Sequence, residues 1–393
     1  MNAKQFTDKS AGQVIRTIKG YYAFVPHPLP PKISWTPLAV ALLSKADRAL
    51  GELAGIGRAL PNPHLLILPF ARREAVLSSR IEGTQASLSD LFAYEAAPNA
   101  AAVGDVHEVF NHVRALEFGL SRLADLPLSL RLIREVHERL MRGVRGEYST
   151  PGEFRRSQNW IGPAGCVLND ATYVPPPIEE MPACLAEFES FLHVESNLPP
   201  LAKLAMIHYQ FEAIHPFIDG NGRIGRLIVV MLLCLWNLLP QPLLYLSAYF
   251  EANRQMYYDL LLSVTLRGAW EEWLSFFLEG VESQALDAIR RAHRIQDLRR
   301  EYRKRFQATQ SSAKLLQVID LLFGAPILSV TQVKEAIGVS FPSANRYIKQ
   351  LESDGIIQEI TGQSRNRLYR AEAILQAIEG SLEDETGGMQ KLG

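Results

Sequence analysis

The sequence has few cysteines and almost no excess charge, and both shortages narrow the classes of protein that it can encode. The three cysteines in 393 residues, Cys166, Cys184 and Cys234, are odd in number and lack metal-ligand spacing. This usage is typical of a reducing compartment, so we expect the protein in the cytoplasm. A formal net charge of -1 gives no overall attraction to nucleic acid or to an anionic membrane.

Long apolar runs are also absent. The longest, residues 227–239, is too short to span a bilayer and predicts a buried helix. The N-terminal segment lacks the apolar core of a signal peptide. With 47% hydrophobic and 21% charged residues, the chain has an ordinary globular composition, and its length predicts two or three domains.

The most informative segment is HPFIDGNGRIGR at residues 215–226, which gathers a histidine, a carboxylate, glycines and two arginines within about three helical turns. Apolar residues recur at helical spacing across residues 201–214. Proline disfavours the α conformation in the residue before it, so this helix should end where His215 precedes Pro216. The apolar run at 227–239 predicts a second helix. The glycines should therefore lie at a helix N-terminus, where backbone N–H groups form an anion site.

Two common phosphate-binding motifs fit this run only in part. Gly220, Gly222 and Gly225 satisfy GxGxxG, but a helix precedes them where a dinucleotide-binding fold has a strand, and no acid follows at the required distance. A P-loop needs Lys and Ser or Thr where Arg226 and Leu227 stand. We therefore reject both motifs.

The residue types themselves indicate phosphoryl or nucleotidyl transfer. His215 can take a proton from an incoming nucleophile. Asp219 can hold a divalent cation, since Mg²⁺ favours one or two carboxylates plus substrate phosphates. Arg223 and Arg226 can grip phosphate oxygens in bidentate fashion. An ordinary turn beside a core histidine would explain any one of these residues, but the ordered set favours catalysis by positioning and charge stabilisation.

The run resembles the Fic family signature HxFx(D/E)GNGRxxR at every specified position. The matching residues are His215, Phe217, Asp219, Gly220, Asn221, Gly222, Arg223 and Arg226. The resemblance implies a protein adenylyltransferase that moves AMP from ATP to a Ser, Thr or Tyr hydroxyl of a target protein. We expect a mainly α fold class: a helical Fic core with a small β-hairpin flap, followed by a winged-helix-like α+β domain.

The resemblance also assigns roles to individual positions. It makes His215 the base that deprotonates the target hydroxyl, places Mg²⁺ on Asp219, and packs Phe217 in the core. Asp at the metal position, with Gly-Asn-Gly intact, is similar to the branch that transfers AMP and not phosphate or phosphocholine. The implied nucleotide-binding residues are Gly220, Asn221 and Gly222 around the phosphates, Arg223 and Arg226 on the β and γ groups, Ile224 and Gly225 between them, and Tyr257 beside adenine.

Residues 152–177 have the turn glycines and short apolar pieces of a hairpin. They resemble the flap that lies beside the Fic active site. Such a flap can hold a target segment by strand addition, with main-chain hydrogen bonds supplying the affinity. A purely structural hairpin is the other interpretation. We expect the target protein to dock here, and self-modification stays open.

Far upstream, residues 78–83 read SSRIEG and match the (S/T)xxxE(G/N) element that marks an inhibitory helix in Fic proteins. Alone, so short a pattern would indicate a surface helix end. Beside a Fic signature, the resemblance implies that Glu82 occupies Arg226 and holds transfer in check. Gly83 predicts that the helix stops just after Glu82, and Ser78 lies on the same helical face.

Shifts in composition predict five segments. These are a helical N-terminal region with the inhibitory motif (1–100), the Fic core (101–280), a connecting helix (281–310), a winged-helix-like domain (311–380) and a polar tail (381–393).

The winged-helix-like prediction rests on helical stretches at 315–323, 331–337 and 341–351 and on short strands near 356–360 and 368–369. In such a fold the third helix can enter a major groove, here with Arg346 and Lys349 outward and Arg365 and Arg367 on the wing. The segment carries seven basic and seven acidic side chains, which is not the basic footprint of a nucleic-acid binder. Protein docking or a homodimer is at least as well supported.

Two functions stay open from the sequence. The favoured one is an adenylyltransferase that uses ATP and Mg²⁺ and is inhibited by Glu82, and removal of AMP from targets also stays open. The alternative is a DNA-binding transcriptional regulator in which the Fic core senses nucleotide. DNA binding that is sequence-selective, salt-dependent and responsive to ATP would distinguish the second function from the first.

Overall fold

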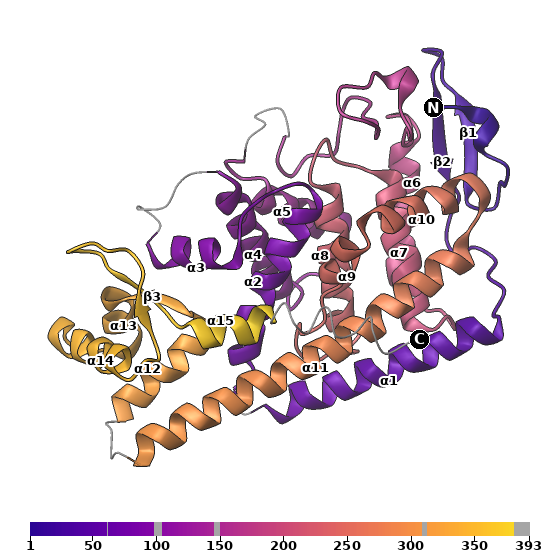
Figure 1. Ribbon diagram of the computed structural model, residues 1–393. Helices are drawn as coiled ribbons and strands as arrows, with labels where there is room; N and C mark the ends of the chain where they lie inside the picture. Colours follow the sequence, from indigo (N-terminus) through magenta and orange to yellow (C-terminus); the bar gives the residue numbers. More distant parts are fainter. Residues whose placement is uncertain (61, 98–103, 145–149, 309–312, 381–393) are drawn as a thin grey trace. The chain divides into compact units, whose positions relative to one another are not determined.

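The computed structural model describes residues 1–60, 62–97, 104–144, 150–308 and 313–380. Over these residues the chain is mainly helical with two small antiparallel sheets, which confirms the predicted mainly α fold class (Figure 1). None of the described helices is long and apolar enough to cross a membrane. The predicted tail at 381–393 lies outside the described residues.

Contacts within the chain divide it into two compact units, and the signature at 215–226 belongs to unit 1, Met1–Ala54 with Asn111–Ala285. Strands β1 (Gly12–Arg16) and β2 (Tyr22–Pro26) pair antiparallel in this unit. Its helices are α5 (Leu130–Leu140), α6 (Met181–His193), α7 (Pro200–Ile214), α8 (Asn221–Leu235), α9 (Ser247–Ala252) and α10 (Arg254–Arg267), with 3-10 helices at Ala3–Gln5 and Leu168–Asp170.

Helix α7 is the centre of unit 1. Helices α6, α8 and α10 and strand β2 all contact it. Every α7 residue except Pro200 and Glu212 is buried, as expected for a helix that is apolar on most sides. Helix α8 is also largely buried. The loop that joins α7 to α8 is therefore held at both ends by core helices.

Unit 2 comprises Gly55–Phe110 and Leu286–Gly393. Its helices are α2 (His64–Ile81), α3 (Leu88–Ala96), α12 (Ala313–Gly324), α13 (Val330–Ile337), α14 (Phe341–Ser353) and α15 (Glu372–Glu379). A three-stranded antiparallel sheet has the order β3 (Ile327–Ser329), β5 (Leu368–Arg370), β4 (Gln358–Glu359). The three helices and two strands predicted between 313 and 380 are present, and β3 is a further strand that the sequence analysis missed.

Three long helices contribute residues to both units: α1 (Pro37–Ala59), α4 (Asp105–Arg122) and α11 (Trp270–Ala308). The predicted connecting helix is part of the 39-residue α11. Sequence composition suggested one region over residues 1–100, whereas the contacts group α2 and α3 with the C-terminal elements. That grouping follows from tertiary packing and leaves no sign in composition.

Candidate active site

The signature run forms the turn between α7 and α8. Helix α7 ends at Ile214, and His215 follows in the left-handed conformation with φ 48°. Gly220, with φ 80°, immediately precedes α8. The predicted helix end at His215 and the predicted glycines at the start of the second helix are both confirmed. A non-glycine residue at positive φ is uncommon, and such constraints cluster at functional sites.

His215 is partly buried, and its ring has a defined hydrogen-bond partner. Its Nδ1 lies 3.3 Å from the carbonyl oxygen of Glu212. A carbonyl can only accept, so this contact assigns the ring proton to Nδ1 and the lone pair to Nε2. Nε2 is therefore the atom of His215 that can take a proton.

Arg155 fastens the predicted flap to the signature run. It is only 2% exposed. Its backbone N–H donates to the Pro216 carbonyl at 2.9 Å, and its Nε donates to the His215 carbonyl at 3.0 Å. Its Nη2 donates to the Pro176 carbonyl at 2.6 Å. One buried guanidinium thus fixes the backbone of the predicted base against the segment 152–177.

Asn221 closes the loop from within. Its Oδ1 accepts the Phe217 N–H at 2.9 Å, and its Nδ2 donates to the Phe217 carbonyl at 2.9 Å. Asn159 donates to the same carbonyl at 2.8 Å. Because the Asn221 side chain is engaged inside the loop, its predicted part in a phosphate cradle falls to its backbone N–H.

Asp219 is the exposed carboxylate of the run. Its side chain is 56% exposed, and Oδ1 lies 3.8 Å from Arg223 Nη2. Oδ1 also accepts the Gly220 N–H at 2.6 Å. Within the described ranges, no group of three or more His, Cys, Asp and Glu side chains could hold a metal ion. A single exposed carboxylate nevertheless fits Mg²⁺, whose other ligands can be substrate phosphates and water.

Arg223 and Arg226 are buried in the first turns of α8, each only 3% exposed. Arg223 Nη2 contacts Met141 Sδ at 3.6 Å. Burial, with the charges of Arg226 and Arg223, lowers the pKa of His112 well below its ordinary value, so this neighbour is neutral. The two arginines stand at a helix N-terminus, where the helix dipole also favours anions.

Gly225 allows α8 to approach α7 closely. A Cβ at this position would meet Glu212 Oε1 and lie 3.3 Å from His208 Cε1. Ile224 is fully buried. The structure thus places these two members of the predicted phosphate-binding run in helix packing, where they fix the positions of Arg223 and Arg226.

His137 of α5 links three parts of the site and was missed by the sequence analysis. Its Nδ1 accepts the Gly152 N–H at 2.9 Å, so its proton is on Nε2, which donates to the Asp219 carbonyl at 3.0 Å. Its ring stacks on Phe217 with centroids 3.7 Å apart. Burial lowers the pKa of His137 to about 4, although the bond to Asp219 opposes that shift. A lone histidine on an amphipathic helix gives no sequence signal for such a role.

Tyr257 lies in the core of unit 1. It is 1% exposed, its hydroxyl is 2.9 Å from His208 Nε2, and its ring stacks on Phe250 at 4.5 Å. A ring so covered can touch adenine only if the core opens, so the adenine role stays a prediction. The neighbouring Tyr258 is 39% exposed.

The residues of the predicted inhibitory motif lie at the end of α2 in unit 2. The helix ends at Ile81, Glu82 is its C-cap residue, and Gly83 follows with φ 104°. The predicted helix stop is therefore confirmed. Ser78 is fully buried, whereas Glu82 is exposed.

The predicted flap has one antiparallel bridge and no longer strands. Ile161 and Tyr173 exchange backbone hydrogen bonds of 2.9 and 3.0 Å. At its base, Phe24 of β2 donates to the Val174 carbonyl at 2.9 Å. Trp160 and Ile161 are 41% and 43% exposed. The segment is therefore anchored at its base and exposes large apolar side chains beyond it.

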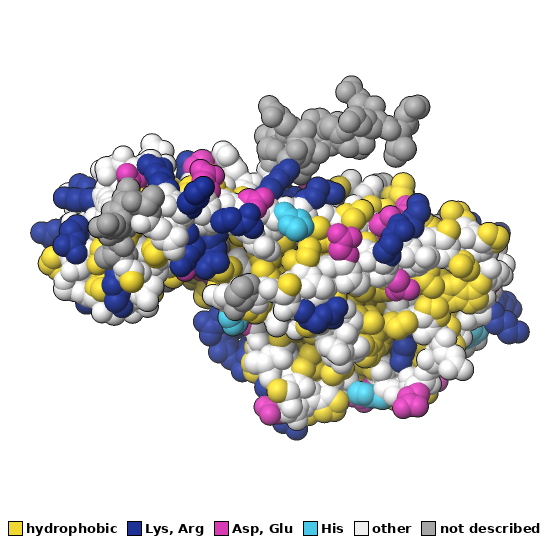
Figure 2. Space-filling view, turned by 90° about the horizontal axis from the view of Figure 1, so that it is seen from below, with side chains coloured by type: hydrophobic (Ala, Val, Ile, Leu, Met, Phe, Trp, Pro, Cys, Tyr) yellow, Lys and Arg dark blue, Asp and Glu magenta, His cyan; other side chains and the backbone are white. Residues whose placement is uncertain are grey.

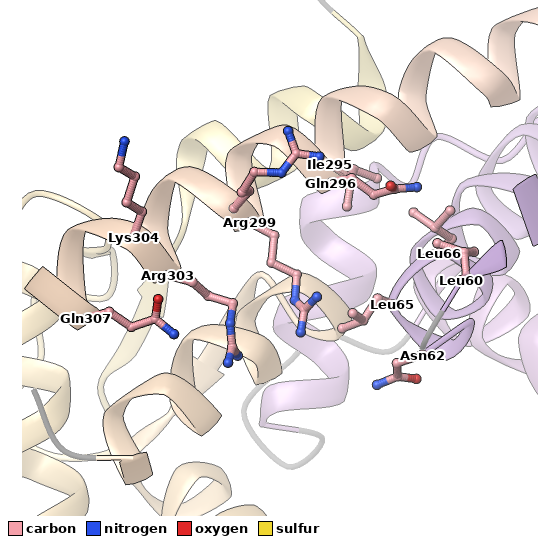
Figure 3. Close-up of a pocket in the computed structure, with 11 residues that line it drawn as sticks. Leu60, Asn62, Leu65, Leu66, Ile295, Gln296, Arg299, Arg303, Lys304 and Gln307 are labelled. Atoms are coloured by element: carbon pink, nitrogen blue, oxygen red, sulfur yellow. The ribbon is translucent and has the colours of Figure 1, made fainter.

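A cavity of about 470 Å³ lies within unit 2 (Figure 3). Arg299 Nε and Arg303 Nη1 on its wall donate to the two carboxylate oxygens of Asp320 at 2.8 and 2.7 Å. Lys304 points away from both arginines in the close-up. Because the inward arginines already have a carboxylate partner, we assign the candidate active site to residues 215–226 and not to this cavity.

Comparisons with known proteins identify the same segment. Residues 127–233 match the model of the Fic/DOC family, and residues 40–121 match that of the Fic/DOC family N-terminal region. The chain contains Fic/DOC family domains. The match to the Fic domain spans the signature run and His137, and the N-terminal match spans the Glu82 motif.

Relatives of the Fic domain carry the name protein adenylyltransferase Fic. The relative from Drosophila willistoni is 31% identical over 159 residues, which are 39% of this chain and 30% of that protein. The relative from Drosophila virilis is 31% identical over 140 residues, or 35% of this chain and 27% of that protein. The chain thus spans less than a third of the length of these curated relatives.

Solved structures share the Fic fold with this chain. A Fic family protein from Desulfovibrio desulfuricans G20 has a TM-score of 0.56 at 22% identity, covering 87% of this chain and 98% of that one. Fic-1 from C. elegans has a TM-score of 0.51 at 23% identity, covering 64% and 73%. At these identities the likeness establishes the fold alone.

Proposed function

We propose that this Fic-domain protein transfers AMP from ATP to a Ser, Thr or Tyr hydroxyl of a target protein. The observation that carries the proposal is the orientation of His215, whose Nδ1 contact to Glu212 assigns the lone pair to Nε2 at the entrance to α8. A base beside a helix N-terminus and two buried arginines has the parts that nucleotidyl transfer requires. The relatives named protein adenylyltransferase Fic support the same reaction.

In the proposed step, Nε2 of His215 takes the proton of the target hydroxyl. The hydroxyl oxygen bonds to the α-phosphorus of ATP, the bond from that phosphorus to the β-phosphate oxygen breaks, and pyrophosphate leaves. The backbone N–H groups at the start of α8, with Arg223 and Arg226, bind the phosphates in this step. When bound by Asp219 and the phosphates, Mg²⁺ would neutralise charge on the departing group.

The target segment is proposed to dock at residues 152–177. Only one bridge, Ile161 to Tyr173, pairs the two sides of this flap, so an added strand would meet little existing sheet pairing there. Main-chain pairing makes little demand on the target sequence. The same geometry would accept a segment of another copy of this chain, so self-modification belongs to the proposal.

Glu82 is proposed to inhibit transfer by engaging Arg226. Support comes from the family motif, from the position of Glu82 as the C-cap of α2, and from Gly83, whose positive φ ends the helix there. An acid at a helix C-terminus is locally unfavourable by a few tenths to about 1 kcal/mol, and a cationic partner would offset that cost.

Incubation with labelled ATP, Mg²⁺ and cell lysate, followed by mass spectrometry, tests the proposed activity. We expect an AMP adduct with the wild type and its loss with His215→Ala. The matched control is His193→Ala, which removes an exposed histidine in the last turn of α6. If His215→Ala transfers AMP as fast as the wild type, His215 is not the base. Incubation of purified adduct with fresh protein tests removal of AMP.

A second candidate function is DNA binding through residues 313–380. Arg346, Lys349, Arg365 and Arg367 are all exposed, as the winged-helix-like interpretation predicts. Figure 2 shows Lys and Arg side chains over the part of unit 2 that holds α13 and α14. The balance of charge over the whole segment opposes this function. Salt-dependent, sequence-selective binding to duplex DNA would establish it, and its absence would leave protein docking or a homodimer interface.

We also propose the cytoplasm as the working compartment. All three cysteines are free thiols, which accords with reducing conditions.

A further inference from the structure

Helix α2, which carries the Glu82 motif, packs on the C-terminal elements of unit 2. Helices α12 and α15 both contact it, and strand β3 contacts α3, the next helix in the chain (Figure 1). At the end of α12, a Cβ on Gly324 would lie 3.3 Å from Leu68 Cδ1. These neighbours are more than 200 residues away from α2 in sequence, so the contact is purely tertiary.

Charged groups reinforce this packing along one side of α2. Arg73 lies 3.7 Å from Asp287, which also accepts from Arg291 at 2.6 Å. Arg291 in turn donates to the Ile378 carbonyl of α15 at 2.7 Å. Burial and the charge of Glu372 raise the pKa of the next residue, Glu379, and the charges of Arg80, Arg73 and Arg291 oppose that shift. Arg80 lies inside the motif, two positions before Glu82.

A second link runs through α3. Arg72 of α2 pairs with Glu95 at 2.7 Å. The Glu95 carbonyl accepts from Gln332 Nε2 at 3.2 Å. Gln332 also completes the capping box of α13 with Ser329. The start of α13 is therefore coupled to α2 through one ion pair and one hydrogen bond.

An isolated helix of about this length is marginally stable in water, so most of its stability comes from packing. Helices α12 and α15 supply part of that packing, so they restrain α2 as a whole. We propose that the C-terminal region, residues 313–380, restrains α2 and so sets the strength of inhibition by Glu82. This inference rests on the proposed function. It assigns a regulatory task to a region that contributes no residue to the candidate active site.

The substitution Glu379→Lys tests the proposal in the full chain. It replaces a carboxylate that interacts electrostatically with Arg80, Arg73 and Arg291 by an ammonium, which those arginines repel, and should loosen α15 from α2. We expect AMP transfer to rise about fivefold, at the low end of ordinary coupling between two sites. The matched control is Glu335→Lys, the same charge change at an exposed position of α13. Hydrogen exchange of the α2 amides should rise for Glu379→Lys and stay at the wild-type level for Glu335→Lys.

Combination with Glu82→Gly separates this inference from the function on which it rests. If the C-terminal region acts through Glu82, the double variant should match Glu82→Gly alone. The inference is wrong if Glu82→Gly is activated but Glu379→Lys keeps wild-type activity. It is also wrong if the double variant is a further fivefold more active than Glu82→Gly. Either result would leave the proposed inhibition by Glu82 intact. If Glu82→Gly does not raise AMP transfer, both the proposed inhibition by Glu82 and this inference are wrong. Where Glu379→Lys does not fold, Glu379→Gln gives the same comparison with a smaller expected effect.

Discussion

At the residue scale, His137 makes several contacts around the site that its position in the sequence does not indicate. It joins the first residue of the flap, Gly152, to the carbonyl of Asp219 and also stacks on Phe217. Both ring nitrogens are engaged by the protein backbone, so we expect its part to be the positioning of Asp219 and the flap. Residues of this kind affect a reaction through the geometry of others.

We expect His137→Phe to reduce AMP transfer about tenfold or more, because two hydrogen bonds of about 1 kcal/mol each are lost while the ring stack is kept. Thermal stabilisation by ATP with Mg²⁺ should fall in parallel. His137→Gln, whose amide can accept and donate, should recover part of both. If His137→Phe folds and keeps the wild-type response to ATP and Mg²⁺, the histidine is merely structural.

Asp219→Ala should raise the Mg²⁺ concentration needed for half-maximal transfer and lower the maximal rate, because the one protein carboxylate proposed for the cation is removed. The side chain is 56% exposed, so the melting temperature should change little. A Mg²⁺ titration of the variant beside Asp125→Ala, an exposed carboxylate in the same unit, measures the effect. Transfer that never requires a divalent cation would contradict the metal assignment.

At the element scale, the flap depends on Arg155. The guanidinium donates to the carbonyls of His215 and Pro176, which belong to different segments of unit 1. Arg155→Lys keeps the charge but cannot reproduce the planar pair of donors. We expect about 2 kcal/mol of destabilisation, since one buried carbonyl loses its partner, together with reduced transfer. The control Arg131→Lys changes an exposed arginine of α5 outside the flap, and it should leave both the melting temperature and the rate unchanged.

At the scale of the whole molecule, the proposed regulation joins a helix of unit 2 to an arginine of unit 1. Glu82→Gly should raise transfer by up to about a hundredfold, because small displacements from the in-line geometry have effects of that size. Arg226→Ala should lower transfer, and Glu82→Gly should not rescue it. Self- and target-adenylylation of the wild type, both single variants and the double variant, at matched ATP and Mg²⁺, provides the measurement. Equal rates for the wild type and Glu82→Gly would show that the motif is an ordinary helix end.

The sequence by itself determined the local structure around the site. A proline after His215 ends α7 because it restricts the residue before it, and glycines before α8 and after α2 permit the positive φ found there. Periodic apolar residues predicted the three helices of the C-terminal region, because a helix buries the side chains that recur on one of its faces. The Fic signature also led us to propose His215 as the base, Asp219 as the metal carboxylate, and Arg223 and Arg226 as phosphate ligands, since their order along the chain is itself the pattern.

Only the tertiary structure decided which distant residues meet. His137 and Arg155 act through contacts to residues about 60 to 80 positions away, which no local pattern records. Tyr257 lies in the core because its neighbours cover it, and α2 joins the C-terminal elements because α12 and α15 contact it. The helix ends set by proline and glycine depend on backbone sterics within a few residues, so the sequence predicts them. Burial and long-range hydrogen bonds depend on the packing of the complete chain, so they emerge only when the fold is formed.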